Sequence, residues 1–215
     1  AGNVEDFDLS PKGERALFAA RGDIFTSPIE NGPTRNLTRT SGAHDRAPAW
    51  SPDGKQIVFI SDLSGEEELY LVPQDGSSAG KALTKGNKAR LYRPVWSGDG
   101  KRVAYSDKEG RIFVVTVADG KQLEIANERN AQVEDYAWSP CGSWLAFSLS
   151  QENGNNALYL FGVDHLGLSI SRFTPLWAAQ IPLAVCAAVA LDNVLRGALG
   201  RRVSGQLWLR PGYAR

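Results

Sequence analysis

The chain has 215 residues, which is enough for one or two domains with a substantial core. Its 24 basic and 24 acidic side chains give a formal net charge of zero, which removes the electrostatic argument for nucleic acid or an anionic membrane surface as a partner. The 22 glycines and 11 prolines favour many turns over long helices.

One hexapeptide recurs along the chain and divides it into units. LSPKGE stands at 9–14, WSPDGK at 50–55, WSGDGK at 96–101 and WSPCGS at 138–143, so the copies begin 41, 46 and 42 residues apart. Proline fixes φ at the first corner of a turn, aspartate bonds back to the backbone, and glycine accepts a positive φ. Each copy therefore predicts a tight hairpin turn. A repeat period of this size is typical of solenoids and propellers.

Each unit contains the same four short apolar runs in chain order. In the second unit they are PAWS, IVFIS, ELYLVP and KALT. They are rich in β-branched and aromatic residues and bounded by turn residues, as strands are. The connections leave no room for a crossover helix, so neighbouring strands are predicted to be antiparallel. Four such strands per unit predict one propeller blade. The blades are expected at about 4–40, 43–85, 92–127 and 133–174, within a propeller region at 1–174.

Tryptophan ends the first run of three units, at positions 50, 96 and 138. Because the residue recurs at one position of the repeat, we expect Trp50, Trp96 and Trp138 to fill the space between adjacent blades. The alternative is that they line a ligand site. The acidic run at 66–68 is expected on a solvated face.

The segments that lead into the first strand of a blade carry several charged residues. They read SGAHDRAP, KARLYRP and AQVEDY before the second, third and fourth blades. Since connections into the innermost strands lie at one mouth of a propeller channel, these side chains are expected to share a rim that contacts peptides. Solvated loops would have the same sequence, so that reading stays open. The expected rim residues are His44, Asp45, Arg46, Arg90, Arg93, Glu134 and Asp135.

The sequence shows no catalytic or cofactor motif. There is no GxSxG, HExxH, P-loop or dinucleotide glycine pattern. Only two histidines are present, which limits general-base chemistry, and His165 is expected in a solvated turn. Cys141 and Cys186 belong to no CxxC or Cys/His cluster and are expected to be unpaired thiols. We therefore expect no catalytic residue, cofactor or metal ligand in this chain.

The repeat pattern stops near residue 163, and the tail at 175–215 is rich in alanine, leucine and arginine. This change fits either a shifted reading frame or a fused, unrelated segment. The apolar stretch at 176–191 has 16 residues, fewer than the roughly 20 that a spanning helix needs, so we do not expect a membrane span. The tail is expected to be a short helix on an open blade edge or to be disordered. The chain begins at Ala1 and has no methionine, so it reads as a fragment or a processed product.

The repeat resembles the WD-like propeller repeat that the TolB family, the prolyl-oligopeptidase-type propellers and the tricorn proteases share. The run PAWSPDGKQIVFISDLSGEEELYLVPQDGS at 48–77 carries this resemblance. A narrower likeness, to the second propeller of bacterial tricorn-like serine peptidases, lies in the residues at 4–55, in SDKEGRIFVVTVADGK at 106–121 and in DYAWSPCGSWLAFSLS at 135–150. The resemblance covers roughly residues 4–174. Propellers of this family have six or seven blades, so four units read as part of one.

The resemblance implies a non-catalytic propeller segment that gates or binds peptides. In the tricorn family two propellers precede a PDZ domain and the catalytic domains, which hold the serine nucleophile. None of the family's catalytic motifs matches a position here. The implied partners are peptides or proteins on the propeller face, the PDZ and catalytic domains of the parent chain, and further subunits. The cytoplasm is the expected compartment, with the periplasm as the alternative. Two other functions stay open: a TolB-type protein-interaction module, and the propeller lid of a prolyl-oligopeptidase-like hydrolase.

Overall fold

The computed structural model describes residues 4–127, 133, 135–150, 156–163 and 169–170. Among these residues there are strands and turns but no helix, and therefore no helix with the length and apolarity that crossing a bilayer requires. The predicted tail at 175–215, together with His165 and Cys186, lies outside the described residues.

In the described part of the chain, sixteen strands form four separate four-stranded antiparallel sheets, each in simple chain order. Blade 1 comprises β1 (Val4–Leu9), β2 (Arg15–Ala20), β3 (Asp23–Pro28) and β4 (Arg35–Asn36). Blade 2 comprises β5 (Asp45–Trp50), β6 (Gln56–Ser61), β7 (Glu68–Pro73) and β8 (Lys81–Ala82). Blade 3 comprises β9 (Leu91–Trp96), β10 (Arg102–Asp107), β11 (Arg111–Thr116) and β12 (Gln122–Asn127). Blade 4 comprises β13 (Tyr136–Trp138), β14 (Trp144–Ser150), β15 (Asn156–Gly162) and β16 (Ser169–Ile170).

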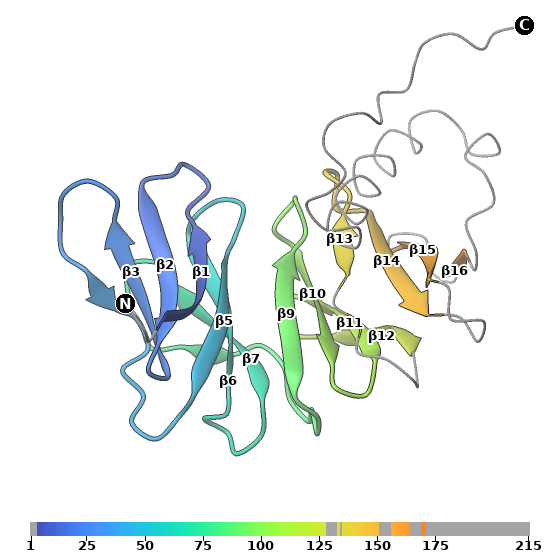
Figure 1. The fold of residues 1–215 in the computed structure, drawn as a ribbon, viewed down its shortest axis with the longest axis horizontal. Coiled ribbons are helices and arrows are strands. Elements are labelled where there is room, and N and C mark those ends of the chain that lie inside the picture. The colour runs from blue at the N-terminus through green and yellow to red at the C-terminus, as the bar shows by residue number, and fades with distance from the viewer. Residues whose placement is uncertain (1–3, 128–132, 134, 151–155, 164–168, 171–215) are drawn as a thin grey trace, which may run out of the picture.

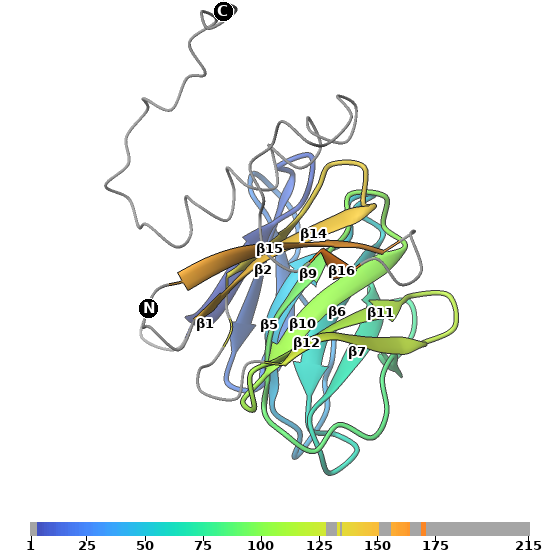
Figure 2. The ribbon, with the colours of Figure 1, turned by 90° about the vertical axis from the view of Figure 1, so that its right-hand side faces the viewer.

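The four sheets follow one another side by side in chain order (Figure 1). Figure 2 views this row from the blade 4 end and shows the strands of successive sheets crossing at an angle, as in a stack of rotated blades. The first strand of each blade lies next to the first strand of the following blade, through contacts of β1 with β5, β5 with β9 and β9 with β13. The predicted all-β class with four antiparallel blades is confirmed.

The hexapeptides form the hairpin turns between the first and second strands, as their sequence predicts. In blade 2 the Ser51 hydroxyl donates to Asp53 Oδ1 at 2.7 Å and accepts from the Gln56 amide at 2.9 Å. The Lys55 amide also donates to Asp53 Oδ1, at 3.0 Å, and Gly54 has a φ of +71°. Blade 3 repeats these bonds with the turn that starts at Ser97. The turn geometry is therefore local, because each bond joins residues that lie within five positions of one another.

The tryptophans pack between blades. Trp50 belongs to an apolar cluster with Leu17 and Ile24 of blade 1, and Trp96 to one with Val58 of blade 2. Trp138 lies with residues of blade 3 in a third cluster. The indole Nε1 of Trp96 donates to the Ala49 carbonyl at 3.1 Å, and that of Trp138 donates to the Val95 carbonyl at 3.0 Å. Each of these two indoles therefore supplies the hydrogen-bond donor for a backbone carbonyl on the free edge of the preceding blade's first strand.

The Leu-Thr pair at the end of a unit has a similar structural role. Leu83 is buried between blades 2 and 3, and Thr84 Oγ1 accepts from the Leu69 amide at 2.9 Å. The same hydroxyl donates to the Glu68 carboxylate. In blade 1, Thr38 makes the equivalent bonds to Ile24 and Asp23. The threonine thus fixes the last run of the unit to the start of its third strand.

Candidate functional site

The expected rim lies where β5, β9 and β13 begin, and its residues divide into supporting and exposed groups. Asp45 is fully buried. Its Oδ2 accepts from the Thr40 hydroxyl at 2.7 Å, and its amide donates to the Gly22 carbonyl at 2.9 Å. The Asp45 carboxylate therefore holds the connection between blades 1 and 2 in place and does not face solvent.

Arg46 is buried as well and forms a clamp between blades 2 and 3. Its guanidinium donates to the two carboxylate oxygens of Glu67, at 2.6 and 3.2 Å, and to the Leu91 carbonyl at 2.7 Å. The Leu91 amide in turn donates to Glu67 Oε2 at 2.6 Å. A bidentate pair of this kind is geometrically specific. It sets the position of β9 relative to β5.

The acidic run at 66–68 is not a solvated face, so that expectation was wrong for Glu67 and Glu68. Glu68 is buried and accepts hydrogen bonds from Thr84 and Asn87. Asn87 Oδ1 accepts from the Tyr105 hydroxyl at 3.3 Å, and that hydroxyl also donates to Gln122 Oε1 at 2.6 Å. Burial raises the pKa of the Tyr105 phenol, so it remains a hydrogen-bond donor. Glu67 and Glu68 are shielded because they also bond to Leu91 and Asn87, which follow blade 2 in the chain, and sequence spacing does not reveal these contacts.

The remaining described rim residues reach solvent. His44 is half-exposed, and its Nε2 lies 3.7 Å from Glu5 Oε2 of blade 1. Arg90 and Arg93 of blade 3 have exposed side chains, while the Arg93 carbonyl accepts from the Tyr136 hydroxyl of blade 4. Asp135 is partly buried, and its carbonyl accepts from the Ser148 amide at 3.1 Å. Glu134 lies outside the described residues.

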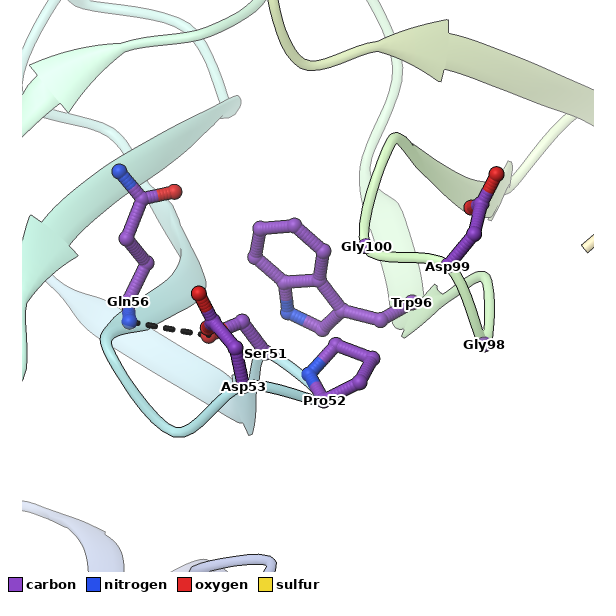
Figure 3. A pocket seen from close by; sticks show the side chains of 8 residues that line it. All are labelled: Ser51, Pro52, Asp53, Gln56, Trp96, Gly98, Asp99 and Gly100. Atoms are coloured by element: carbon purple, nitrogen blue, oxygen red, sulfur yellow. Dashed lines mark hydrogen bonds between the residues drawn. The ribbon is translucent and has the colours of Figure 1, made fainter.

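A pocket of about 330 Å³ lies at the opposite ends of the first strands, between the hexapeptide turns of blades 2 and 3. Figure 3 shows the Trp96 indole between the two turns, with Asp53 and Gln56 beside it. Asp99 projects away from the indole in this view, and its carboxylate lies against Gly142 of blade 4. The residues that line the pocket are Ser51, Pro52, Asp53, Gln56, Trp96, Gly98, Asp99 and Gly100.

The carboxylates of the two turns are held in their ionised form. The hydroxyl of Ser51 and the amide of Lys55 lower the pKa of Asp53 below its ordinary value. Burial opposes the same shift at Asp99, but hydrogen bonds from Ser97 and Lys101 outweigh it and lower the pKa of Asp99 too. Asp53 therefore gives the pocket a negative charge at neutral pH, next to the polar amide of Gln56 and the indole of Trp96.

One residue that lines the pocket, Gly98, departs from the hexapeptide of the repeat. Gly98 takes the place of the proline of WSPDGK, and a Cβ at this position would lie only 2.4 Å from the Pro140 carbonyl oxygen. Glycine therefore lets the turn of blade 4 approach the turn of blade 3. Among the described residues, no group of three or more His, Cys, Asp or Glu side chains is arranged to hold a metal ion.

Comparison with known proteins identifies a family. The family model described as the tricorn protease second beta propeller domain matches residues 4–168. Tricorn protease homolog 1 of Streptomyces coelicolor is 29% identical over 166 residues, which are 75% of this chain and 15% of that protein. The chain thus spans only a small part of this relative's length.

Two solved structures share the fold. The crystal structure of the tricorn protease matches with a TM-score of 0.66 and 17% identity, over 75% of this chain and 16% of that one. TolB from Acinetobacter baumannii matches with a TM-score of 0.59 and 16% identity, over 75% of this chain and 41% of that one. At these identities the likeness concerns the fold alone.

Proposed function

Because the chain belongs to the tricorn protease second β-propeller family, we propose that it binds peptides without cleaving them. In a longer, tricorn-like serine peptidase it would serve as a gating or binding segment for peptide substrates and products. Hydrolysis would take place in another part of that protein, since no nucleophile motif stands in this sequence.

The pocket between the turns of blades 2 and 3 is the observation that carries this proposal. It combines an ionised carboxylate, a carboxamide and an indole, contributed by Asp53, Gln56 and Trp96. This set suits an ammonium or guanidinium group, which gains from a nearby carboxylate and from the face of an aromatic ring. We therefore propose that the pocket receives a lysine or arginine side chain of a peptide.

The rim at the other ends of the first strands is proposed as a second contact region for peptides. His44, Arg90 and Arg93 have accessible side chains there. The guanidinium groups of Arg90 and Arg93 would attract the carboxylates of a peptide. Asp45 and Arg46 support this surface from beneath and make no contact with the peptide, because both are buried in bonds between blades.

Binding at the pocket can be measured with two labelled pentapeptides that differ only in a central arginine or its neutral analogue citrulline. Fluorescence anisotropy should show tighter binding of the arginine peptide. Asp53→Asn should weaken that binding about three- to fivefold, because a partly exposed ion pair contributes up to about 1 kcal/mol. Asparagine keeps an oxygen for the bonds from Ser51 and Lys55, so the turn is preserved.

Asp75→Asn is the matched control, since Asp75 also accepts from the amide two residues ahead but lies outside the pocket. It should leave the affinity unchanged. Equal binding of the two peptides, or equal effects of the two variants, would contradict the proposed pocket. Cleavage of either peptide that a serine-directed inhibitor abolishes would contradict the non-catalytic role.

A further inference from the structure

A backbone donor beside the pocket has no acceptor among the described residues. The amide of Ser97 donates to the Arg102 carbonyl of β10 at 2.9 Å. Because successive amides of a strand point to opposite sides, the amide of Trp96 points away from β10, toward the free edge of β9. No described residue accepts a hydrogen bond from it there. Trp96 therefore presents its indole to the pocket (Figure 3) and its amide to the free edge.

The equivalent amide in blade 2 shows which group such a donor binds. It belongs to Trp50 and donates to Oδ2 of Asp8 on β1, at 2.9 Å. The strand registers give Ala49 of β5 the position that Asp8 has in β1. The methyl group of Ala49 is smaller than the side chain of Asp8 and cannot accept a hydrogen bond. The Trp96 amide therefore lies in the setting where the preceding boundary between blades holds a carboxylate oxygen.

The other two boundaries between blades lack this combination. Between blades 1 and 2 the amide is already bonded to a carboxylate, and the turn of blade 1 has Lys12 where the turn of blade 2 has Asp53. Between blades 3 and 4 the larger Val95 stands beside the equivalent amide. The turns of those two blades also approach closely, because Gly98 admits the Pro140 carbonyl. Among the described residues, a turn carboxylate, a pocket and an unbonded amide thus coincide only between blades 2 and 3.

We infer that the boundary between blades 2 and 3 binds the last residue of peptides that end in arginine or lysine. The cationic side chain enters the pocket beside Asp53 and the Trp96 indole, and the terminal carboxylate accepts from the Trp96 amide. One C-terminal residue carries both groups on its α-carbon, just as Trp96 presents both of their partners. The inference rests on the proposed function, because it assigns the cationic side chain to the same pocket.

The charge of the terminal carboxylate decides between a C-terminal and an internal arginine. An internal arginine presents a neutral carbonyl to the Trp96 amide, whereas a C-terminal arginine presents a carboxylate. Hydrogen bonds to an ionised acceptor are roughly twice as strong as those to a neutral one. Since the net contribution of a neutral bond is about 1 kcal/mol, the terminal carboxylate should tighten binding about fivefold.

Four pentapeptides with a fluorophore at the amino terminus test the inference on the unmodified full chain. Their last residue is arginine or citrulline, and each is made with a free carboxylate and with a C-terminal amide. Fluorescence anisotropy should show the tightest binding for arginine with a free carboxylate, and amidation should weaken it about fivefold. An arginine preference that amidation leaves unchanged would keep the proposed pocket and overturn this inference. Equal binding of arginine and citrulline peptides would contradict the pocket itself.

Ala49→Asn tests the assignment to the Trp96 amide. Its side-chain oxygen takes the position that the Asp8 carboxylate has one blade earlier, so it should accept from the Trp96 amide and remove most of the preference for a free carboxylate. The preference for arginine over citrulline should persist, because asparagine adds no charge.

Ala79→Asn is the matched control, since Ala79 is exposed in the connection between β7 and β8, outside the pocket. It should leave both preferences unchanged. A carboxylate preference that survives in folded Ala49→Asn, or that Ala79→Asn removes equally, would overturn the inference. The peptide comparison on the unmodified chain decides the question even if Ala49→Asn fails to fold.

Discussion

The three repeat tryptophans should differ in what they contribute to stability, although they are buried to the same extent. Trp50, Trp96 and Trp138 are 7%, 8% and 7% exposed. Trp96 and Trp138 donate their indole hydrogen to backbone carbonyls of the preceding blade, while the buried Nε1 of Trp50 has no partner among the described residues. Replacing each tryptophan by phenylalanine therefore removes a similar apolar volume but a different polar interaction.

The size of the difference follows from the group that is left behind. Trp96→Phe leaves the Ala49 carbonyl without its donor, and Trp138→Phe does the same to the Val95 carbonyl. Leaving a buried polar group unsatisfied costs about 1–3 kcal/mol. Trp50→Phe removes a donor that was already unsatisfied, so this cost is absent. The free energy of unfolding should therefore fall by about 1–3 kcal/mol more for Trp96→Phe and Trp138→Phe than for Trp50→Phe.

Urea unfolding followed by far-ultraviolet circular dichroism measures this difference without using tryptophan emission. The three variants should unfold with the same denaturant dependence, so that the midpoints can be compared directly. If the three losses agreed within about 0.5 kcal/mol, the usual scatter between independent sites, the indole hydrogen bonds would have no net effect and the reasoning would fail. A larger loss for Trp50→Phe than for the other two would contradict it as well.

Three further changes test the other contacts. Arg46→Met leaves the partly buried Glu67 without its cation and should lower the free energy of unfolding by about 2–4 kcal/mol. In urea unfolding, the double variant Arg46→Met with Glu67→Met should recover part of that loss. If the double variant recovered nothing, the isolated Glu67 carboxylate would not be the cause of the loss. Cys141 occupies the turn position of Asp53, so Cys141→Asn should add about 0.5–1 kcal/mol by restoring an oxygen acceptor for Ser139; an unchanged midpoint would contradict this. The folded pKa of Asp53 lies below its unfolded value of about 3.9, so its ionisation stabilises the fold above that pH and the contribution is lost as the pH falls through the lower, folded pKa. Asp53→Asn should therefore reduce the acid-induced drop of the urea midpoint, and an identical drop in both proteins would exclude this role.

The strands and turns could be predicted because their causes are local. The bonds of Ser51, Asp53 and Gly54 reach no further than Gln56, the residue that follows the hexapeptide, so four copies of the motif predict four equivalent hairpins. The place of the tryptophans between blades followed from their recurrence. The bonds of Trp96 and Trp138 to particular carbonyls did not, because they depend on the rotation between neighbouring sheets.

The rim residues show where sequence reasoning stops. Asp45 and Arg46 are polar residues in a connection, and the sequence alone allows them to be solvated or buried. The structure buries both: Asp45 bonds to Thr40 and Gly22, and Arg46 reaches Leu91, 45 positions along the chain. The pocket could not be predicted for the same reason, since Asp53 and Trp96 come from turns of two different blades.

The repeated and the variable positions of the units carry different tasks. Positions with the same chemistry in several units join neighbouring blades: the indoles of Trp96 and Trp138 donate to carbonyls of the preceding first strand. Where blade 1 meets blade 2, Asp8 accepts from the Trp50 amide at 2.9 Å. These bonds satisfy backbone groups on the free edges of the first strands, which would otherwise invite pairing with another chain. The exposed charges of the rim lie where the units differ, as at Arg93, whose counterpart in blade 2 is Ala47. A stack built in this way can change what it binds at those positions without losing the contacts that hold its blades together.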